Sequence, residues 1–198
     1  MAKGIAFFDF DGTITTTDSY FQFLLFCFGW KGVIGNALKI LPILFSYAFK
    51  FCDNETAKQS ITSTFFRGMS ESKFDELCRN FVDTKLDSIV RPNALEKIKW
   101  HQEQGHKVYI VSASFTKYLK YFAKKYNLEV IATELEVIDG KITGWFASRN
   151  CWGPEKIDRI NEVVPDLDTY DDTYGYGDSN GDKIGMLAIV THPQYRVF

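Results

Sequence analysis

The chain has 198 residues and a net charge of −2, and 45% of its residues are hydrophobic and 24% charged. This length and composition suit one globular domain, or a domain with a small insertion, and they exclude a disordered chain. The small negative charge excludes the basic surface of a nucleic-acid-binding protein, and four cysteines without a C-x-x-C pair argue against a zinc site. Free thiols suit a reducing compartment, so we expect a cytoplasmic protein.

The first predicted element is a buried strand over 5–8, a short apolar run that stops at Asp-Phe-Asp-Gly-Thr over 9–13. Other apolar runs predict strands over 107–111, 130–132, 173–177 and 195–198, and an Asp-Gly pair predicts a hairpin within 135–146. Helices are predicted over 92–104, 116–126, 154–163 and 182–189. Because strands and helices alternate, we predict an α/β fold with a Rossmann-like, mostly parallel sheet.

The segment from residue 18 to residue 86 interrupts this alternation, because it contains only helical patterns. The predicted helices cover 20–30, 32–51, 54–66 and 70–86. We interpret the segment as an all-helical cap, inserted into a core formed by residues 1–17 and 87–198. Its position directly after the first strand predicts that the cap covers the edge of the sheet at which that strand ends.

Polar side chains follow three of the predicted strands. Asp9 and Asp11 follow the first strand, Ser112 and Ser114 follow the second, and Asp178 and Asp182 follow the strand over 173–177. The carboxyl ends of parallel strands meet at one edge of the sheet, so we expect these groups to converge there. Carboxylates so close would repel one another, and a hard divalent cation removes that cost. The sequence therefore predicts a Mg²⁺ site that also offsets the charge of a phosphate group.

The predicted site has the groups that phosphoryl transfer requires. A carboxylate such as Asp9 can attack phosphorus, and a second carboxyl such as Asp11 can exchange protons with the leaving alcohol and with water. Ser112, its neighbouring backbone N–H groups and the cation of Lys156 can bind the phosphoryl oxygens. The alternative is that Asp-x-Asp-Gly-Thr is a capped turn and that Lys156 is a solvated helix residue. The order of these groups along the chain favours the catalytic interpretation.

Four segments resemble the motifs of the haloacid dehalogenase-like superfamily: DFDGT over 9–13, VYIVSAS over 108–114, GPEK over 153–156 and YGYGDSNGD over 174–182. The likeness extends over almost the whole chain, and the helical insert resembles the type-1 cap of subfamily IB, which contains phosphoserine phosphatase. The resemblance implies that Asp9 is the nucleophile and that Asp11 is the general acid and base. Asp11 also implies phosphotransfer rather than dehalogenation, since dehalogenases of this superfamily lack the second acid.

The same resemblance assigns the remaining groups of the site. It implies a Mg²⁺ ion held by the Asp9 side chain, the Asp11 backbone carbonyl and the Asp178 side chain. It implies that this metal site is supported by Asp182, Gly12 and Thr13. The phosphate would be bound by Ser112, Ala113 and Lys156.

Two features of the insert bear on the substrate. Arg67, in the sequence FFRGMS, is similar to a cap arginine of phosphoserine phosphatases, and Asp18 stands where those enzymes have a glutamate, so both are candidates for substrate specificity. Residues 20–51 are very apolar and rich in Phe, which is similar to IB members that dephosphorylate the lipid phosphatidylglycerophosphate. The substrate is therefore expected to be a small phosphomonoester or a lipid phosphomonoester.

Residues 20–51 do not form a continuous membrane-spanning pattern, because Lys31, Lys39 and Pro42 divide the apolar run. Two helices lying on a membrane surface are one interpretation, and they would place a cytoplasmic enzyme at the membrane. An apolar cap packed on itself, or a dimer surface, is the other.

Together these patterns predict a Mg²⁺-dependent phosphatase that forms an aspartyl-phosphate on Asp9. Two alternatives stay open: a phosphotransferase or mutase on the same fold, and a catalytically silent, membrane-associated module that binds phosphate. Hydrolysis of a generic aryl phosphate with and without Mg²⁺ distinguishes the silent module from an enzyme.

Overall fold

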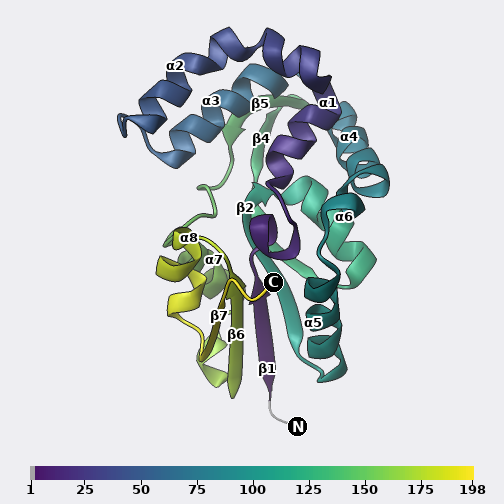
Figure 1. Ribbon diagram of the computed structural model, residues 1–198, viewed down its shortest axis with the longest axis vertical. Coiled ribbons are helices and arrows are strands. Elements are labelled where there is room, and N and C mark those ends of the chain that lie inside the picture. Colours follow the sequence, from purple (N-terminus) through teal and green to yellow (C-terminus); the bar gives the residue numbers. More distant parts are fainter. Residues whose placement is uncertain (1–2) are drawn as a thin grey trace.

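The computed structural model describes residues 3–198, and its centre is a five-stranded sheet (Figure 1). The strand order is β3–β2–β1–β6–β7, and every neighbouring pair is parallel. The strands are β1 (Gly4–Phe8), β2 (Lys107–Phe115), β3 (Glu129–Thr133), β6 (Asp172–Gly177) and β7 (His192–Tyr195). The structure thus confirms the predicted α/β fold with a Rossmann-like parallel sheet.

Helices cover both faces of this sheet, which explains why its strands are continuous apolar runs. The side chains of β1 alternate between the two faces. Ala6 and Phe8 pack into one buried cluster, and Ile5 and Phe7 pack into the other. The first face is covered by α5 (Pro92–Glu103) and α6 (Thr116–Tyr126), and the second by α7 (Glu155–Val163) and α8 (Asn180–Ile184) (Figure 1).

Several element boundaries differ from the sequence prediction. β2 continues four residues beyond the predicted end at Val111, as far as Phe115. The last strand is β7 and not 195–198, because Arg196 takes a positive φ of 54° and ends the strand, while the Phe198 ring stacks on Tyr176. The predicted helix over 182–189 is the shorter α8, since Gly185 leaves the helical conformation after Ile184.

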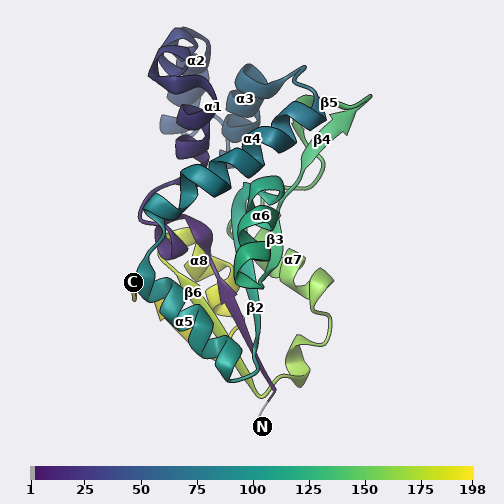
Figure 2. The same ribbon diagram turned by 90° about the vertical axis from the view of Figure 1, so that its right-hand side faces the viewer.

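Four helices lie beyond the carboxyl end of the sheet: α1 (Ser19–Gly35), α2 (Ala37–Ala48), α3 (Asn54–Phe66) and α4 (Glu71–Thr84) (Figures 1 and 2). The predicted helix over 32–51 is divided, because the chain turns at Asn36 between α1 and α2. Phe23 of α1 forms the centre of an aromatic cluster, with ring centroids 5.6 Å from Phe66, 5.7 Å from Phe74 and 5.2 Å from Phe81. This cluster holds α1, α3 and α4 together.

The antiparallel hairpin of β4 (Leu135–Ile138) and β5 (Lys141–Phe146) also packs against these helices. Its turn has the expected Asp139-Gly140 pair, and both residues have positive φ. The backbone N–H of Gly68 donates to Ile142 O at 2.8 Å, and a Cβ on Gly144 would lie 2.4 Å from the Ser63 Cα. A segment from the second half of the chain therefore supports the helical cap.

Candidate active site

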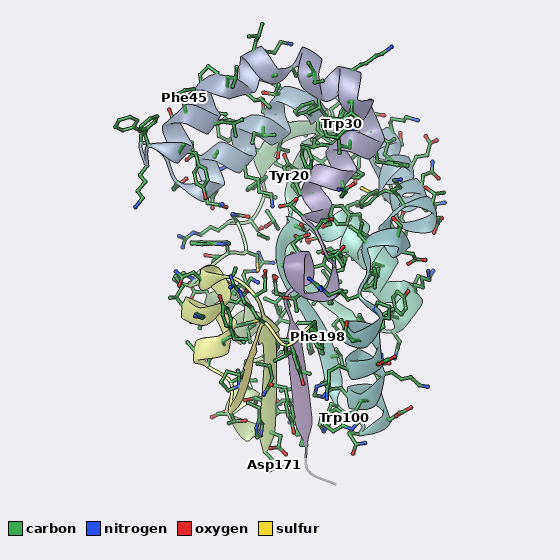
Figure 3. The ribbon with its side chains drawn as sticks, viewed as in Figure 1. Tyr20, Trp30, Phe45, Trp100, Asp171 and Phe198 are labelled. Atoms are coloured by element: carbon green, nitrogen blue, oxygen red, sulfur yellow. The ribbon has the colours of Figure 1, made fainter. Side chains whose placement is uncertain are left out.

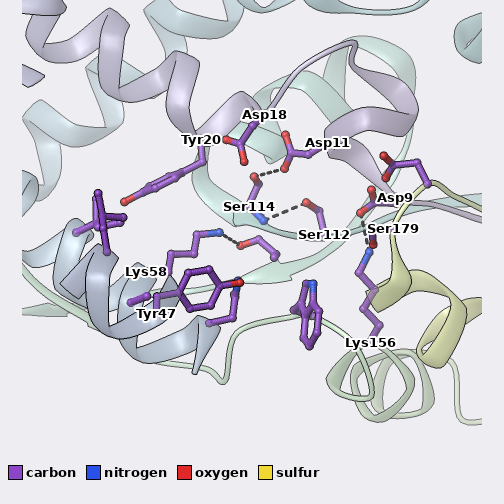
Figure 4. A pocket seen from close by; sticks show the side chains of 17 residues that line it. Asp9, Asp11, Asp18, Tyr20, Tyr47, Lys58, Ser112, Ser114, Lys156 and Ser179 are labelled. Atoms are coloured by element: carbon purple, nitrogen blue, oxygen red, sulfur yellow. Dashed lines mark hydrogen bonds and ion pairs between the residues drawn. The ribbon is translucent and has the colours of Figure 1, made fainter. Parts of the chain in front are cut away.

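A pocket of about 380 Å³ lies between the helices α1–α3 and the carboxyl end of the sheet (Figure 4). The sheet side of the pocket is lined by Asp9 and Asp11 after β1, residues 112–114 of β2, Lys156 of α7 and Asp178 after β6. The predicted convergence of polar groups at this edge of the sheet is what the structure shows.

Lys156 lies between two buried carboxylates. Its Nζ is 2.6 Å from Asp9 Oδ1 and 2.6 Å from Asp182 Oδ1, and Lys156 is only 2% exposed. Burial alone would lower the pKa of Lys156, but the two carboxylates raise it above its ordinary value. Lys156 therefore stays a cation and offsets negative charge at the end of β1, which excludes the solvated-lysine interpretation.

Asp9 is fixed at the end of β1 by the sheet itself. Its backbone N–H donates to Tyr176 O at 2.8 Å, so the parallel ladder with β6 continues one residue past the strand. Burial raises the pKa of Asp9 to about 7, while Lys156 opposes that rise and the neighbouring carboxylates of Asp182 and Asp11 add to it. Additional positive charge near Asp9 would lower this pKa and favour the carboxylate form.

Asp182 is fully buried, and both of its oxygens are engaged. Its Oδ1 accepts from Lys156, and its Oδ2 accepts from the Ser179 hydroxyl at 2.6 Å and from the backbone N–H groups of Ser179 and Asp178 at 3.0 and 3.2 Å. Ser179 and Asp182 thereby form the capping box of α8. Asp182 consequently positions the turn that carries Asp178.

Asp11 is held by one donor to each carboxylate oxygen. The backbone N–H of Ser19 donates to Oδ1 at 2.6 Å. The Ser114 hydroxyl donates to Oδ2, also at 2.6 Å (Figure 4). Ser114 is available because β2 extends beyond the predicted strand, and its own N–H donates to Ser112 Oγ at 3.0 Å. These contacts fix the orientation of the Asp11 carboxylate in the pocket.

The loop that follows β1 requires glycine at position 12. Gly12 has φ +81°, and a Cβ there would lie 2.4 Å from Asp178 Oδ2. The hydroxyl of Thr13 is buried and has no hydrogen-bond partner among residues 3–198. Gly12 thus permits the close approach of the β1 and β6 loops.

The same loops form an acidic cluster that suits a hard cation. Carboxylate oxygens of Asp9, Asp178 and Asp182 lie within 4.8 Å of one another. Burial and the charge of Asp182 raise the pKa of Asp178, so a cation between the loops would relieve their repulsion. Because both oxygens of Asp182 already accept hydrogen bonds, Asp9 and Asp178 are the side chains that fit a Mg²⁺ ion, which takes carboxylate oxygens and waters.

The cap supplies the opposite wall of the pocket, and here the structure adds a residue that the sequence did not indicate. Lys58 of α3 lines the pocket and its Nζ donates to Ala113 O at 2.6 Å. Burial lowers the pKa of Lys58, and the nearby carboxylates of Asp11 and Asp18 oppose that shift. Asp18 also lines the pocket, and it caps α1 by accepting from the Phe21 N–H at 2.7 Å. Arg67 is exposed at the other end of α3 and does not line this pocket.

Fold and site together define an α/β protein with a cluster of acidic side chains at the carboxyl end of a parallel sheet. The chain belongs to the haloacid dehalogenase-like hydrolases, because the model of that family matches residues 6–186. It is 33% identical over 194 residues to Protein CicA of Caulobacter vibrioides, an alignment that covers 96% of this chain and 85% of that protein.

Solved structures share the fold at lower identity. A Bordetella pertussis Tohama I protein of unknown function has a TM-score of 0.83 and 22% identity, covering 98% of this chain and 89% of that one. A probable phosphoserine phosphatase from Vibrio cholerae has a TM-score of 0.72 and 17% identity, covering 98% of this chain and 55% of that one. These likenesses extend over the cap as well as the core.

Proposed function

We propose that the chain is a Mg²⁺-dependent phosphatase that hydrolyses a phosphomonoester through an aspartyl-phosphate on Asp9. The observation that carries this proposal is the buried group of Asp9, Lys156 and Asp182 at the end of β1, next to Asp11 and the residues 112–114. The probable phosphoserine phosphatase from Vibrio cholerae shares this fold, which supports the proposal of a phosphatase.

In the first step, a carboxylate oxygen of Asp9 attacks phosphorus, and the bond between phosphorus and the leaving oxygen breaks. Asp11 gives a proton to the leaving alcohol, which requires the fixed orientation that Ser19 and Ser114 provide. In the second step Asp11 takes a proton from water, whose oxygen attacks phosphorus and releases Asp9.

The phosphoryl oxygens need donors and positive charge during both steps. The Ser112 hydroxyl, the backbone N–H of Ala113 and the Lys156 ammonium are the groups that we assign to them. A Mg²⁺ ion, held by Asp9, Asp178 and the Asp11 carbonyl, would supply the further positive charge that keeps Asp9 ionised and offsets the phosphate dianion. Asp182 supports this arrangement through Lys156 and the loop that carries Asp178.

The cap wall favours an amphiphilic leaving group. Leu44 and Tyr47 of α2 and Ile61 of α3 line the pocket, whereas Arg67 does not. We propose that the substrate is a lipid phosphomonoester, which residues 20–51 would meet at a membrane. The second candidate is a small ester such as phosphoserine, and the observation that favours it is the pair of opposite charges, Lys58 and Asp18, at the same wall.

Phosphate release from a panel of esters tests the proposal. The panel contains a generic aryl phosphate, phosphoserine, sugar and nucleotide phosphates, and phosphatidylglycerophosphate in mixed micelles, each with and without Mg²⁺. We expect Mg²⁺-dependent release that Asp9→Asn abolishes and that the exposed control Asp166→Asn leaves unchanged. Transfer of phosphate to an added alcohol in place of release would establish a transferase, and activity in Asp9→Asn would refute the nucleophile.

A further inference from the structure

The outer side of α2 is an apolar stripe that the rest of the chain leaves exposed. None of the 12 residues of α2 is buried, although the helix is almost entirely apolar. Leu38, Leu41 and Phe45 follow one another at spacings of three and four, so they lie on one side of the helix. Leu38 is 82% exposed and Phe45 63%, and Figure 3 shows Phe45 at the outer edge of the molecule.

The stripe continues at both ends of α2. Phe49 stacks on Phe45 and on Phe51, which is 84% exposed, and Trp30 and Ile34 of α1 are exposed as well. We call these side chains, with Leu38 and Leu41, the α1–α2 surface. Monomeric proteins rarely expose so many large apolar side chains together unless the surface contacts something apolar.

The charges within the segment that carries this surface all have one sign, and the exposed Asp53 directly follows the segment. Residues 19–52 contain three lysines, Lys31, Lys39 and Lys50, and no aspartate or glutamate. All three lysines are exposed, and their apolar stems can lie along a hydrophobic layer while the ammonium groups reach its polar boundary. This combination complements an anionic phospholipid surface, whereas two copies of the surface would bring like charges together.

The apolar residues of α1 and α2 do not form one straight helix. No single helix among residues 3–198 has both the length and the hydropathy for a membrane span, and α1 and α2, which pass only as a pair, bend by 91°. A helix that presents one apolar side, while protein covers its other side, can lie in the plane of the interface with the apolar side in the acyl region.

The opposite side of α2 faces the active site. Tyr47 lies on the opposite side of the helix from Leu38, because the helix has about 3.6 residues per turn, and Leu44 lies between the two sides. Both side chains are partly exposed, and both line the pocket with Asp9 and Asp11. A membrane that contacts the stripe would thus lie one helix thickness from the pocket wall.

We infer that the α1–α2 surface docks the enzyme on an anionic phospholipid bilayer, with the α2 stripe in the acyl boundary and Lys31, Lys39 and Lys50 at the headgroups. The inference deepens the proposed function: the preference for a lipid substrate rests on that function, but docking itself does not require turnover.

Flotation with vesicles that contain no phosphomonoester tests docking separately from catalysis. The probes are vesicles of phosphatidylcholine, with and without phosphatidylglycerol, mixed with the full chain and with its inactive Asp9→Asn variant. We expect both proteins to float only with the phosphatidylglycerol vesicles. If neither protein floats, the docking proposal is wrong. The phosphatase proposal is not affected by that result, because the phosphate-release panel tests it separately.

Two variants and their matched controls assign the contact. Leu38→Ser/Phe45→Ser is expected to lower the partition coefficient roughly tenfold or more, because two apolar side chains no longer leave water. Neutralising Lys31, Lys39 and Lys50 together with Gln is expected to lower it by about fivefold for each lysine. The control for the apolar variant is Val163→Ser, at another exposed apolar residue. The control for the lysine variant places Gln at the exposed Lys99, Lys120 and Lys124. Both control proteins should float as the wild type does.

Turnover of a soluble aryl phosphate checks that these variants fold, and we expect it to be unchanged, since neither Leu38 nor Phe45 lines the pocket. Flotation that Leu38→Ser/Phe45→Ser does not weaken would overturn the assignment of the α1–α2 surface. Sedimentation of the wild type as a dimer that the same variant converts to a monomer would also overturn it, because the surface would then bind a second copy.

Discussion

Replacing Lys156 by methionine removes the buried cation of the site while keeping most of the side-chain length. In the native protein the Lys156 Nζ is 2.6 Å from a carboxylate oxygen of both Asp9 and Asp182. Removal of one partner of a buried ion pair costs about 3–5 kcal/mol, because the remaining charge stays buried without compensation. We therefore expect the free energy of unfolding of Lys156→Met to fall by about 3–5 kcal/mol in Mg²⁺-free buffer at alkaline pH.

The loss of stability in Lys156→Met should be larger at alkaline pH than at acidic pH. Burial raises the pKa of Asp9 to about 7 even with Lys156 present, and removal of the cation raises it further. Below that pH the folded variant binds a proton at Asp9, one buried charge disappears, and the destabilisation becomes smaller. Mg²⁺ is also expected to restore part of the stability, since it adds positive charge at the same carboxylates.

Urea unfolding followed by circular dichroism measures both effects, at one pH well above and one well below 7. The matched control is Lys99→Met, which removes an exposed lysine 3.7 Å from Glu103 and is expected to unfold as wild type does. If Lys156→Met unfolds like Lys99→Met at both pH values, Lys156 does not compensate the two buried carboxylates, and the reasoning about this site is refuted.

Two further predictions concern Lys58 and His101. Lys58→Met should lower kcat/KM by about tenfold or more, which is the loss expected for one charge-assisted hydrogen bond. The control is Lys120→Met, which removes an exposed lysine. Steady-state kinetics that are equal in the two variants would contradict a role of Lys58 in the pocket. His101 is buried, and burial, with smaller contributions from His106 and Lys97, lowers its pKa to about 3. The unfolded chain binds the proton more readily, so stability should decrease as pH falls below about 6.5, by up to about 1.4 kcal/mol per pH unit. Unfolding of His101→Gln across this range should show a smaller pH slope, and an equal slope would contradict the assignment.

The fold and the sheet side of the site were largely readable from the sequence. Short apolar runs that end in polar turns predicted the strands, and the parallel arrangement explains why Asp9, Ser112 and Asp178 meet. The capping role of Asp182 was also within reach, because Ser-x-x-Asp over 179–182 is a capping-box pattern.

The cap side was not readable in the same way, because it depends on how helices pack. The local sequence around Arg67 predicts a specificity residue, but α3 points its first turns toward the pocket. Lys58 therefore lines the pocket, while Arg67 lies at the far end of the helix. The sequence places Ser114 at the same edge of the sheet but assigns it no role, because its contact with Asp11 requires β2 to extend beyond Val111.

Trapping the phosphorylated enzyme shows whether Asp9 carries the phosphoryl group during turnover. The enzyme is mixed with Mg²⁺ and its best phosphomonoester, quenched in acid during turnover, digested, and analysed by mass spectrometry. We predict one phosphoryl group on the peptide that contains Asp9 and none in Asp9→Asn. With an aryl phosphate, whose leaving group needs little protonation, we expect more of the intermediate in Asp11→Asn, because hydrolysis by water lacks its base. Phosphate on another residue, or continued turnover in Asp9→Asn, would contradict the account.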